Sequence, residues 1–324
     1  MTGFLDLEGA VRALVSGELV GFPTETVYGL GADATNPAAL RLLYDVKRRP
    51  TDHPVIVHLS RTEALDEWGV DVSEAAHRLT QRWWPGPLTV VVAAGPRVSR
   101  VATGGLETVG LRVPNHPLAL AMLDTFGGGV AAPSANRFGR VSPTTPESVI
   151  RELDGEIAGV LDGGPCAVGI ESTIVDCGSD PVRVLRPGAI TVEMISELLG
   201  ERVAIGGATR APGTLAAHYA PKARVEIAAG EDIPDRVRSV VETGLRVGVI
   251  NWSQQSPNHP RGETDPNAVT LATVGSADEY AYILYSALRQ ADDLGVDVVL
   301  AIRPGDDGVG RAVLDRLRRA AGGR

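Results

Sequence analysis

The chain has 324 residues, of which 44% are hydrophobic and 22% charged, with a formal net charge of −9. The length exceeds the ~100–200 residues of one typical domain and predicts two domains, and the composition excludes a disordered or fibrous protein. The acidic balance argues against a protein that grips a nucleic-acid backbone by itself.

The first two hundred residues mix helical and extended patterns. Apolar residues at helical spacing predict helices over residues 6–16, 37–46, 73–83, 116–126 and 146–153. Short apolar and β-branched runs predict strands over residues 19–22, 55–59, 88–93, 109–113, 130–132, 157–161, 172–176 and 182–185. This mixture predicts an α/β fold.

The composition changes after residue 203. Residues 204–222 are rich in Gly, Ala and Pro, which predicts a linker between domains at 1–203 and 223–324. In the last domain, strands predicted at 224–228, 246–250, 268–271 and 296–302 alternate with helices at 233–242, 276–294 and 308–321. This alternation predicts a small parallel sheet of doubly wound, Rossmann-like type.

The sequence also limits the cell compartment. No apolar stretch approaches the ~20 residues of a membrane helix, and the N-terminus lacks the basic and apolar regions of a signal peptide. Cys166 and Cys177 form neither a disulfide framework nor a zinc motif. We therefore expect a cytoplasmic protein without membrane contact, whose cysteines stay reduced.

Two segments of the sequence could bind a nucleotide. Residues 29–34 match the dinucleotide fingerprint GxGxxA, but they neither follow a strand directly nor open a helix, so a dehydrogenase is a weak hypothesis. No P-loop motif is present. Lys47 and Arg49 could instead neutralise a phosphate held by the small residues around Ser134, or they could be solvated charges beside an ordinary turn.

Two polar residues, His58 and Arg112, lie within predicted apolar strands. Arg112 must be paired if it is buried, and its fork suits a carboxylate or a phosphate. A lone histidine such as His58 is more often a satisfied core residue than a ligand. Asp33, Asp52 and Asp162 could bind a metal, but no spacing selects them, so no metal ligand is assigned.

Eight segments together resemble the YrdC-like threonylcarbamoyl-AMP synthases. They follow the order of that family over about residues 8–200: FPTETVYGLG at 22–31, Lys47-x-Arg49-Pro50, PVIVH at 54–58, WPGPLT at 84–89, LRVP at 111–114, APSAN at 132–136, ESTIVD at 171–176 and LRPG at 185–188. Residues 212–213 and 218–221, with the following α/β block, resemble the long two-domain form. The resemblance implies a twisted mixed sheet with flanking helices, plus a smaller Rossmann-like C-terminal domain.

The resemblance also implies a reaction. L-threonine, bicarbonate and ATP, with Mg²⁺ carried on the ATP phosphates, would give threonylcarbamoyl-AMP and pyrophosphate. A separate threonylcarbamoyl transferase complex would then modify an adenosine of tRNA, with weak or no direct tRNA binding by this chain. The main alternative is a YrdC-like module that binds nucleotide or RNA without synthesis; carbamoyl-adenylate chemistry is another, but its accompanying acylphosphatase and zinc-finger modules are missing here.

Site residues are carried over from the resemblance position by position. The implied threonine site consists of Thr26, His58, Arg112, Ala132 and Ser172. The implied ATP contacts are Arg49, His53, Thr108, Ser134, Ser142, Arg186 and Tyr219, with Lys47 near the phosphates and Lys47 and Arg49 as the catalytic cations. The family usually has Asn where this chain has His53, and Gly where it has Arg48. The linker with Tyr219 is expected to act as a lid over the nucleotide.

Overall fold

A computed structural model describes residues 2–207, 209–212, 219–252 and 267–322. The chain forms two compact units, one of residues 1–138 and 142–214 and the other of residues 139–141 and 215–324. The predicted boundaries 1–203, 204–222 and 223–324 stay predictions; the division at 214/215 falls inside the predicted linker. Within the described ranges, no helix is both long and apolar enough to cross a membrane.

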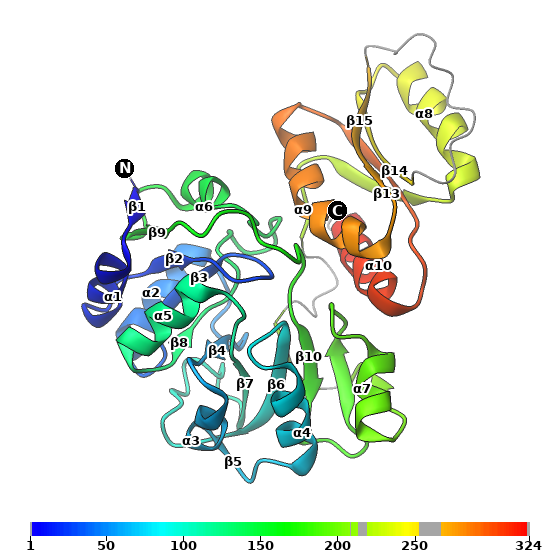
Figure 1. Ribbon diagram of the computed structural model, residues 1–324. Helices are drawn as coiled ribbons and strands as arrows, with labels where there is room; N and C mark the ends of the chain where they lie inside the picture. The colour runs from blue at the N-terminus through cyan, green and yellow to red at the C-terminus, as the bar shows by residue number, and fades with distance from the viewer. Residues whose placement is uncertain (1, 208, 213–218, 253–266, 323–324) are drawn as a thin grey trace. The chain divides into compact units, whose positions relative to one another are not determined.

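The described residues of the first unit contain a mixed sheet of 12 strands, which confirms the predicted sheet type (Figure 1). Its order is β1 (Phe4–Leu5), β9 (Gly159–Leu161), β2 (Val20–Phe22), β3 (Gly29–Asp33), β8 (Val130–Ala131), β4 (Ile56–His58), β7 (Thr108–Arg112), β6 (Leu88–Ala94), β10 (Thr173–Asp176), β11 (Arg183–Arg186) and β12 (Ala204–Ile205), with β5 (Gly69–Val70) beside β6. β4 pairs with β7 and β6 with β10 in parallel, whereas β6 and β7 are antiparallel. The start of the predicted linker, Ala204–Ile205, is thus an edge strand of this sheet.

Seven α-helices of the described first unit flank the sheet: α1 (Leu7–Val15), α2 (Pro37–Lys47), α3 (Leu65–Trp68), α4 (Glu74–Trp83), α5 (Pro117–Phe126), α6 (Pro146–Leu153) and α7 (Val192–Leu199). A short 3₁₀ helix, η1 (Thr62–Ala64), precedes α3. Side chains cap several N-termini: Asn36, for example, accepts hydrogen bonds from the first backbone N–H groups of α2. Gly127 and Gly200 end α5 and α7 in the left-handed conformation that favours glycine.

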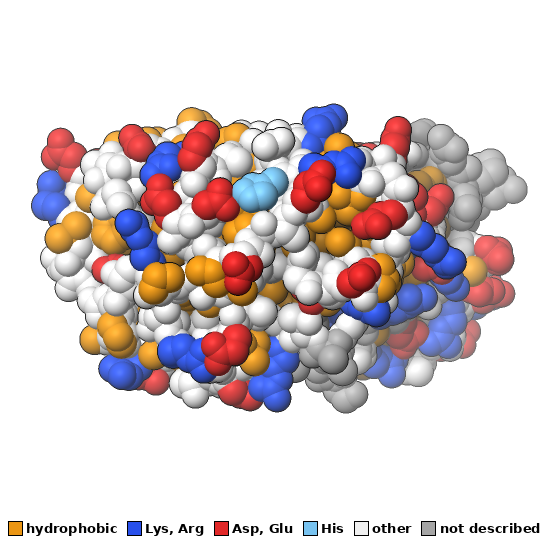
Figure 2. All heavy atoms as spheres, turned by 90° about the horizontal axis from the view of Figure 1, so that it is seen from below, with side chains coloured by type: hydrophobic (Ala, Val, Ile, Leu, Met, Phe, Trp, Pro, Cys, Tyr) orange, Lys and Arg blue, Asp and Glu red, His pale blue; other side chains and the backbone are white. Residues whose placement is uncertain are grey.

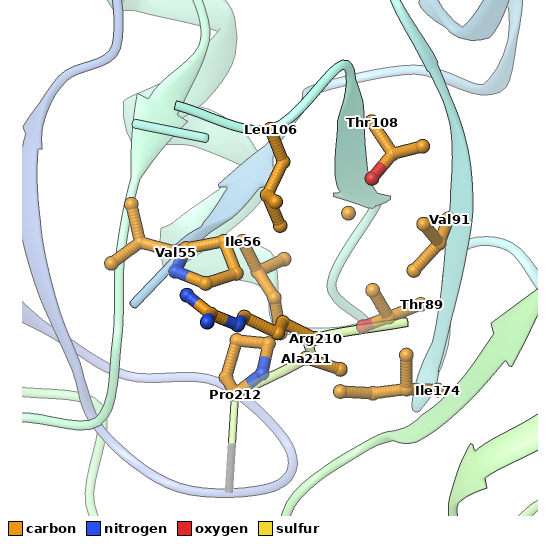
Figure 3. Close-up of a pocket in the computed structure, with 12 residues that line it drawn as sticks. Val55, Ile56, Thr89, Val91, Leu106, Thr108, Ile174, Arg210, Ala211 and Pro212 are labelled. Atoms are coloured by element: carbon orange, nitrogen blue, oxygen red, sulfur yellow. The ribbon is translucent and has the colours of Figure 1, made fainter. Parts of the chain in front are cut away.

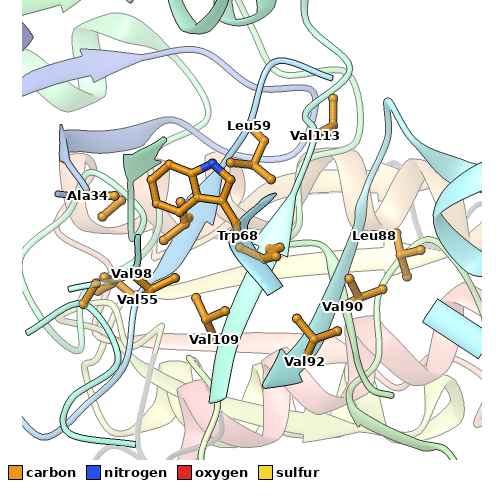
Figure 4. Packing of buried hydrophobic residues seen from close by; sticks show 14 of the residues in the cluster. Ala34, Val55, Leu59, Trp68, Leu88, Val90, Val92, Val98, Val109 and Val113 are labelled. Atoms are coloured by element: carbon orange, nitrogen blue, oxygen red, sulfur yellow. The ribbon is translucent and has the colours of Figure 1, made fainter. Parts of the chain in front are cut away.

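The two faces of the central strands differ in character. Side chains alternate between the faces of a strand, and on one face the β6 residues Leu88, Val90 and Val92 join a large apolar cluster. Figure 4 shows Trp68 of α3 within this cluster. The intervening residues of the same strands point to the opposite face, which carries the candidate site.

The second unit contains a four-stranded parallel sheet in the order β13 (Arg224–Ala228), β16 (Val298–Ile302), β14 (Val247–Trp252) and β15 (Ala268–Val274). Helices α8 (Ile233–Glu242), α9 (Ala277–Asp293) and α10 (Gly308–Ala321) accompany it, with a short 3₁₀ helix, η2 (Gly230–Asp232). Ser276 caps α9 by accepting from the Glu279 N–H (3.1 Å), and Glu279 accepts from the Gly275 N–H (2.6 Å). The predicted Rossmann-like α/β character of this part is confirmed.

Candidate active site

Two neighbouring strands carry polar side chains on the face opposite the apolar cluster. β4 and β7 run parallel, with Ile56 beside Gly110 and His58 beside Arg112. Because side chains alternate along a strand, these four residues share one face, while Val57 packs in the cluster on the other. His58 and Arg112 are only 3% and 4% exposed. The fold therefore holds an imidazole and a guanidinium side by side in a buried position.

Arg112 is paired by the segment between β2 and β3. Its Nη2 atom donates a hydrogen bond to Thr26 Oγ1 (2.9 Å) and lies 2.7 Å from Glu25 Oε2. Thr26 Oγ1 is also 2.8 Å from Thr24 Oγ1. A buried guanidinium requires such partners, and Glu25 supplies the opposite charge. Sequence reasoning missed Glu25, although a carboxylate next to a predicted site residue in an apolar segment was a usable signal.

His58 is a neutral imidazole. Burial, helped by the charge of Arg112, lowers the pKa of His58 to about 3, and its ring meets the edge of Phe22 with 5.7 Å between ring centres. The N–H of Ala132 donates to the carbonyl of Ile56 (2.8 Å), so Ala132 lies beside the strand that carries His58. Four of the five predicted threonine-site residues therefore meet at β4 and β7.

Ser172 and Arg186 form a second buried group. The hydroxyls of Ser172 and Thr89 are 2.8 Å apart. Arg186 donates from Nε and Nη2 to the Ser172 carbonyl (3.1 and 2.9 Å) and from Nη2 to the Ser172 hydroxyl (3.1 Å). Its Nη1 atom donates to the carbonyl of Pro212 (3.0 Å). A residue predicted for threonine and a residue predicted for ATP are thus bonded directly to each other.

Lys47 ends α2 and reaches the loop that follows β8. Its ammonium group donates to the backbone carbonyls of Ser134 (2.5 Å) and Asn136. Burial, followed by the charge of Arg49, holds the pKa of Lys47 well below its ordinary value. In this structure Lys47 therefore fixes the loop that carries Ser134.

Arg49 and His53 meet on one aromatic ring. The guanidinium carbon of Arg49 lies 5.6 Å from the ring centre of Phe138, and His53 meets the same ring edge-on at 5.7 Å. Arg49 also donates to the carbonyl of Pro54 (2.8 Å). Burial and the charge of Arg49 lower the pKa of His53, so a neutral ring stands where the family usually has Asn.

A buried carboxylate orients another predicted ATP contact. The hydroxyl of Ser142 donates to Glu171 Oε1 (2.6 Å), and both side chains are buried. The sequence predicted a role for the Ser172 hydroxyl next to Glu171, but none for the Glu171 carboxylate. The carboxylate therefore fixes the direction in which the Ser142 hydroxyl points.

A small pocket, with a cavity volume of about 10 Å³, lies on the same face of the sheet (Figure 3). Thr108, Gly110 and Arg112 alternate on one face of β7, so the pocket continues the surface that carries Arg112. Its walls come from the strands and from the described part of the predicted linker: Pro54, Val55, Ile56, Thr89, Val91, Leu106, Thr108, Gly110, Ile174, Arg210, Ala211 and Pro212. Thr108, predicted to contact ATP, therefore lines a pocket next to the buried Arg112.

The described linker residues are attached to the first unit by side-chain contacts. Thr209 Oγ1 donates to Asp176 Oδ2 (2.6 Å), and Arg210 Nη1 donates to Asp52 Oδ2 (3.2 Å). Between them, Ala211 packs in an apolar cluster and is 8% exposed. These contacts place residues 209–212 at the pocket; closure over a nucleotide stays a prediction.

Tyr219 lies in the second unit. The Tyr219 ring stacks on Tyr285 with 5.6 Å between ring centres. The guanidinium carbon of Arg316 lies 5.3 Å from the ring centre of Tyr219. The predicted contact between Tyr219 and the nucleotide stays a prediction. The other predicted site residues lie in the first unit. Most of them fall in three groups, around Arg112, around Arg186 and around Lys47 and Phe138, whereas Thr108 lines the pocket and Ser142 is bonded to Glu171.

Two known family models match the chain. Residues 12–188 match the Sua5–YciO–YrdC family model, described as "Telomere recombination". Residues 190–322 match the model described as "Threonylcarbamoyl-AMP synthase, C-terminal domain". The two matches together cover both structural units.

Similar proteins extend over nearly the whole chain. Threonylcarbamoyl-AMP synthase of Bacillus subtilis is 40% identical over 97% of this chain and 92% of its own length. The enzyme of the same name from Pyrococcus abyssi is 39% identical over 94% and 91%. The crystal structure of P. abyssi Sua5 complexed with L-threonine matches with a TM-score of 0.89 and 38% identity, covering 98% of this chain and 94% of that one. The chain belongs to the threonylcarbamoyl-AMP synthase family, in its two-domain form.

Proposed function

We propose that the chain is an L-threonylcarbamoyladenylate synthase, which makes threonylcarbamoyl-AMP and pyrophosphate from L-threonine, bicarbonate and ATP. The observation that carries the proposal is the buried Arg112, held by Thr26 beside His58 on the polar face of the sheet. The nearly full-length relatives named as synthases support it and do not support the alternative of a binding module without synthesis.

In this proposal the amino acid binds at β4 and β7. A fixed guanidinium suits a carboxylate because its N–H groups are planar and can donate in pairs. Arg112 would bind the threonine carboxylate. Thr26, His58 and Ala132 beside it, with Ser172 from the second buried group, would surround the amino acid. His58 contributes as a neutral imidazole, because its low pKa keeps a second positive charge out of the site.

ATP would bind along the adjoining loops and pocket. The proposed contacts are Arg49, His53, Thr108, Ser134, Ser142, Arg186 and Tyr219, with Lys47 fixing the Ser134 loop close to the phosphates. The threonine amine, once deprotonated, and bicarbonate would first form a carbamate with loss of water. A carbamate oxygen would then attack the α-phosphorus, and pyrophosphate would leave. Both reactants are anions, so positioning and positive charge from Arg49, Arg186 and Lys47 lower the barrier more than a side-chain base would.

Mg²⁺ would arrive on the ATP phosphates. Among the residues that the structure describes, no three His, Cys, Asp or Glu side chains gather as a metal-binding group. In ATP-using enzymes Mg²⁺ is often held mainly by phosphate oxygens and water. The ion would neutralise charge on the phosphates while the chain's own cations hold them in place.

We further propose that the product is passed to a separate threonylcarbamoyl transferase complex that acts on tRNA in the cytoplasm. The net charge of −9 argues against strong direct binding of tRNA. Figure 2 supports this view for one face of the molecule, where acidic and basic side chains are interspersed over much of the surface. Transfer would then depend on contact between proteins rather than on capture of tRNA by this chain.

Pyrophosphate release from ATP tests the proposed reaction. Release should require L-threonine and bicarbonate together, in the presence of Mg²⁺. Arg112→Lys keeps the charge beside Glu25 but loses the guanidinium fork, so the KM for threonine should rise at least about tenfold with little change in the KM for ATP. The matched control, Arg12→Lys, alters an exposed ion pair of α1 and should change neither. Release that ignores threonine would contradict the proposal.

A further inference from the structure

The ion pair between Glu25 and Arg112 has unused hydrogen-bonding capacity on both sides. The two side chains are 7% and 4% exposed, with 2.7 Å between Glu25 Oε2 and Arg112 Nη2. Within the described residues, Glu25 Oε1 and Arg112 Nε have no hydrogen-bond partner. Buried polar atoms are nearly always bonded in folded proteins, so an acceptor and a donor left open in one pair call for a ligand with the complementary groups.

Stability alone does not explain this pair. Removing two charges from water costs more than their attraction commonly returns, and an apolar replacement of the same volume is often as stable. A pair that also leaves a carboxylate oxygen and a guanidinium N–H unbonded is less favourable still. The arrangement is therefore better explained by what it binds than by what it contributes to folding.

The groups that surround Glu25 and Arg112 are neutral. Thr26 bonds Arg112 through its hydroxyl and stays neutral. The imidazole of His58 is neutral at ordinary pH. The charges of Glu25 and Arg112 both act on the thiol of Cys166, but burial raises the pKa of this thiol to about 12, so it stays neutral. A bound molecule would thus meet one negative and one positive group side by side.

We propose that Glu25 is the counter-ion for the α-ammonium group of L-threonine. An amino acid at neutral pH carries a carboxylate and an ammonium group on the same carbon atom, and the adjacent Arg112 and Glu25 offer the opposite charges at matching positions. Arg112 receives the carboxylate, and Glu25 accepts a hydrogen bond from the ammonium group. This inference rests on the proposed function and adds to it the residue that recognises the amino end of the substrate.

The test compares two ligands that differ only in the amino group. (R)-3-hydroxybutyrate keeps the carboxylate, hydroxyl and methyl groups of L-threonine but lacks the ammonium. Ligand-observed NMR reaches millimolar Kd values and can follow both ligands with wild type, Glu25→Gln and Glu8→Gln. The last variant removes the carboxylate of an exposed arginine pair on α1 and serves as the matched control.

Glu25→Gln should weaken L-threonine binding by about 10- to 100-fold, the range expected for a lost hydrogen bond to a charged group. Binding of (R)-3-hydroxybutyrate should change by less than about threefold, and Glu8→Gln should change neither ligand. Equal weakening of both ligands would mean that Glu25 only holds Arg112 in place, and would overturn the inference. No weakening of threonine binding would overturn it as well.

Wild-type protein provides a check that does not depend on folding of the variant. It should bind L-threonine at least about tenfold more tightly than (R)-3-hydroxybutyrate. Equal affinities would overturn the role of Glu25 while leaving the proposed synthase intact. Failure of the wild type to bind L-threonine at all would instead contradict the proposed function itself.

Discussion

Replacing Arg112 by Met should destabilise the first unit by an amount that depends on pH. The substitution leaves the carboxylate of Glu25 buried without its partner, and breaking a buried pair in this way costs about 3–5 kcal/mol. The cost has a ceiling, because an unpaired carboxylate can be protonated instead. For an ordinary glutamic acid, protonation at pH 7 costs about 3.7 kcal/mol, and at pH 5.5 about 1.6 kcal/mol.

The lost hydrogen bond to Thr26 adds about 1 kcal/mol. We therefore expect Arg112→Met to lower the free energy of unfolding by about 4 to 5 kcal/mol at pH 7 and about 2.5 kcal/mol at pH 5.5, from these two contributions. The double variant Glu25→Gln/Arg112→Met leaves no buried charge and should recover about 3 kcal/mol of the loss at pH 7.

Tryptophan fluorescence can follow this change in guanidinium chloride. Trp68, Trp83 and Trp84 lie in the first unit and Trp252 in the second, so a Trp252→Phe background makes the signal report the first unit. A loss below about 1 kcal/mol, or one that does not shrink at pH 5.5, would refute the reasoning, since both numbers follow from an uncompensated buried carboxylate. A double variant no more stable than Arg112→Met would refute it too.

Three further predictions concern single side chains. The low pKa of His58 means that its share of stability is present above pH 6.5 and is lost as the pH falls toward 3; an NMR titration should place its midpoint far below 6, and a midpoint between 6 and 7 would contradict the burial argument. The raised pKa of Cys166 should keep its thiol unreactive toward Ellman's reagent at pH 8 until the protein unfolds, whereas rapid reaction of the native thiol would refute this. Thr209→Val removes a hydrogen bond worth about 1 kcal/mol, so trypsin should cleave after Arg210 about fivefold faster; Thr35→Val, which removes another hydroxyl–carboxylate bond, should leave that rate unchanged, and equal rates in all three proteins would show that the contact does not hold the segment.

The fold was predictable where local patterns are strong. The run at β6 is apolar and β-branched, and the strand forms as expected. β3 was missed because Gly29–Asp33 contains two glycines and no β-branched residue. The strand pairs with β2 and β8, and its glycines leave room for the ring of Phe22: a Cβ at Gly29 or Gly31 would come within 2.9–3.1 Å of that ring. Small residues that admit a neighbouring side chain are a tertiary requirement, which strand propensity does not register.

The candidate site divides in the same way. The sequence indicates that Arg112 needs a partner once it is buried, but Glu25 lies 87 positions earlier, and only the folded chain brings the two together. Glu171, which holds Ser142, was missed for the same reason. Lys47 was expected near phosphates, and the structure adds that its ammonium group bonds the loop after β8, a contact across 87 and 89 positions that no local pattern predicts.

The most direct test of the proposed reaction follows carbon from bicarbonate into the product. The purified protein would be incubated with ATP, Mg²⁺, L-threonine and ¹³C-labelled bicarbonate. The adenylates would then be separated, and their masses measured by mass spectrometry. The account predicts a threonylcarbamoyl-AMP species that is one mass unit heavier than with unlabelled bicarbonate and that does not form without threonine. ATP conversion that yields only AMP or ADP, with no labelled adenylate, would contradict it.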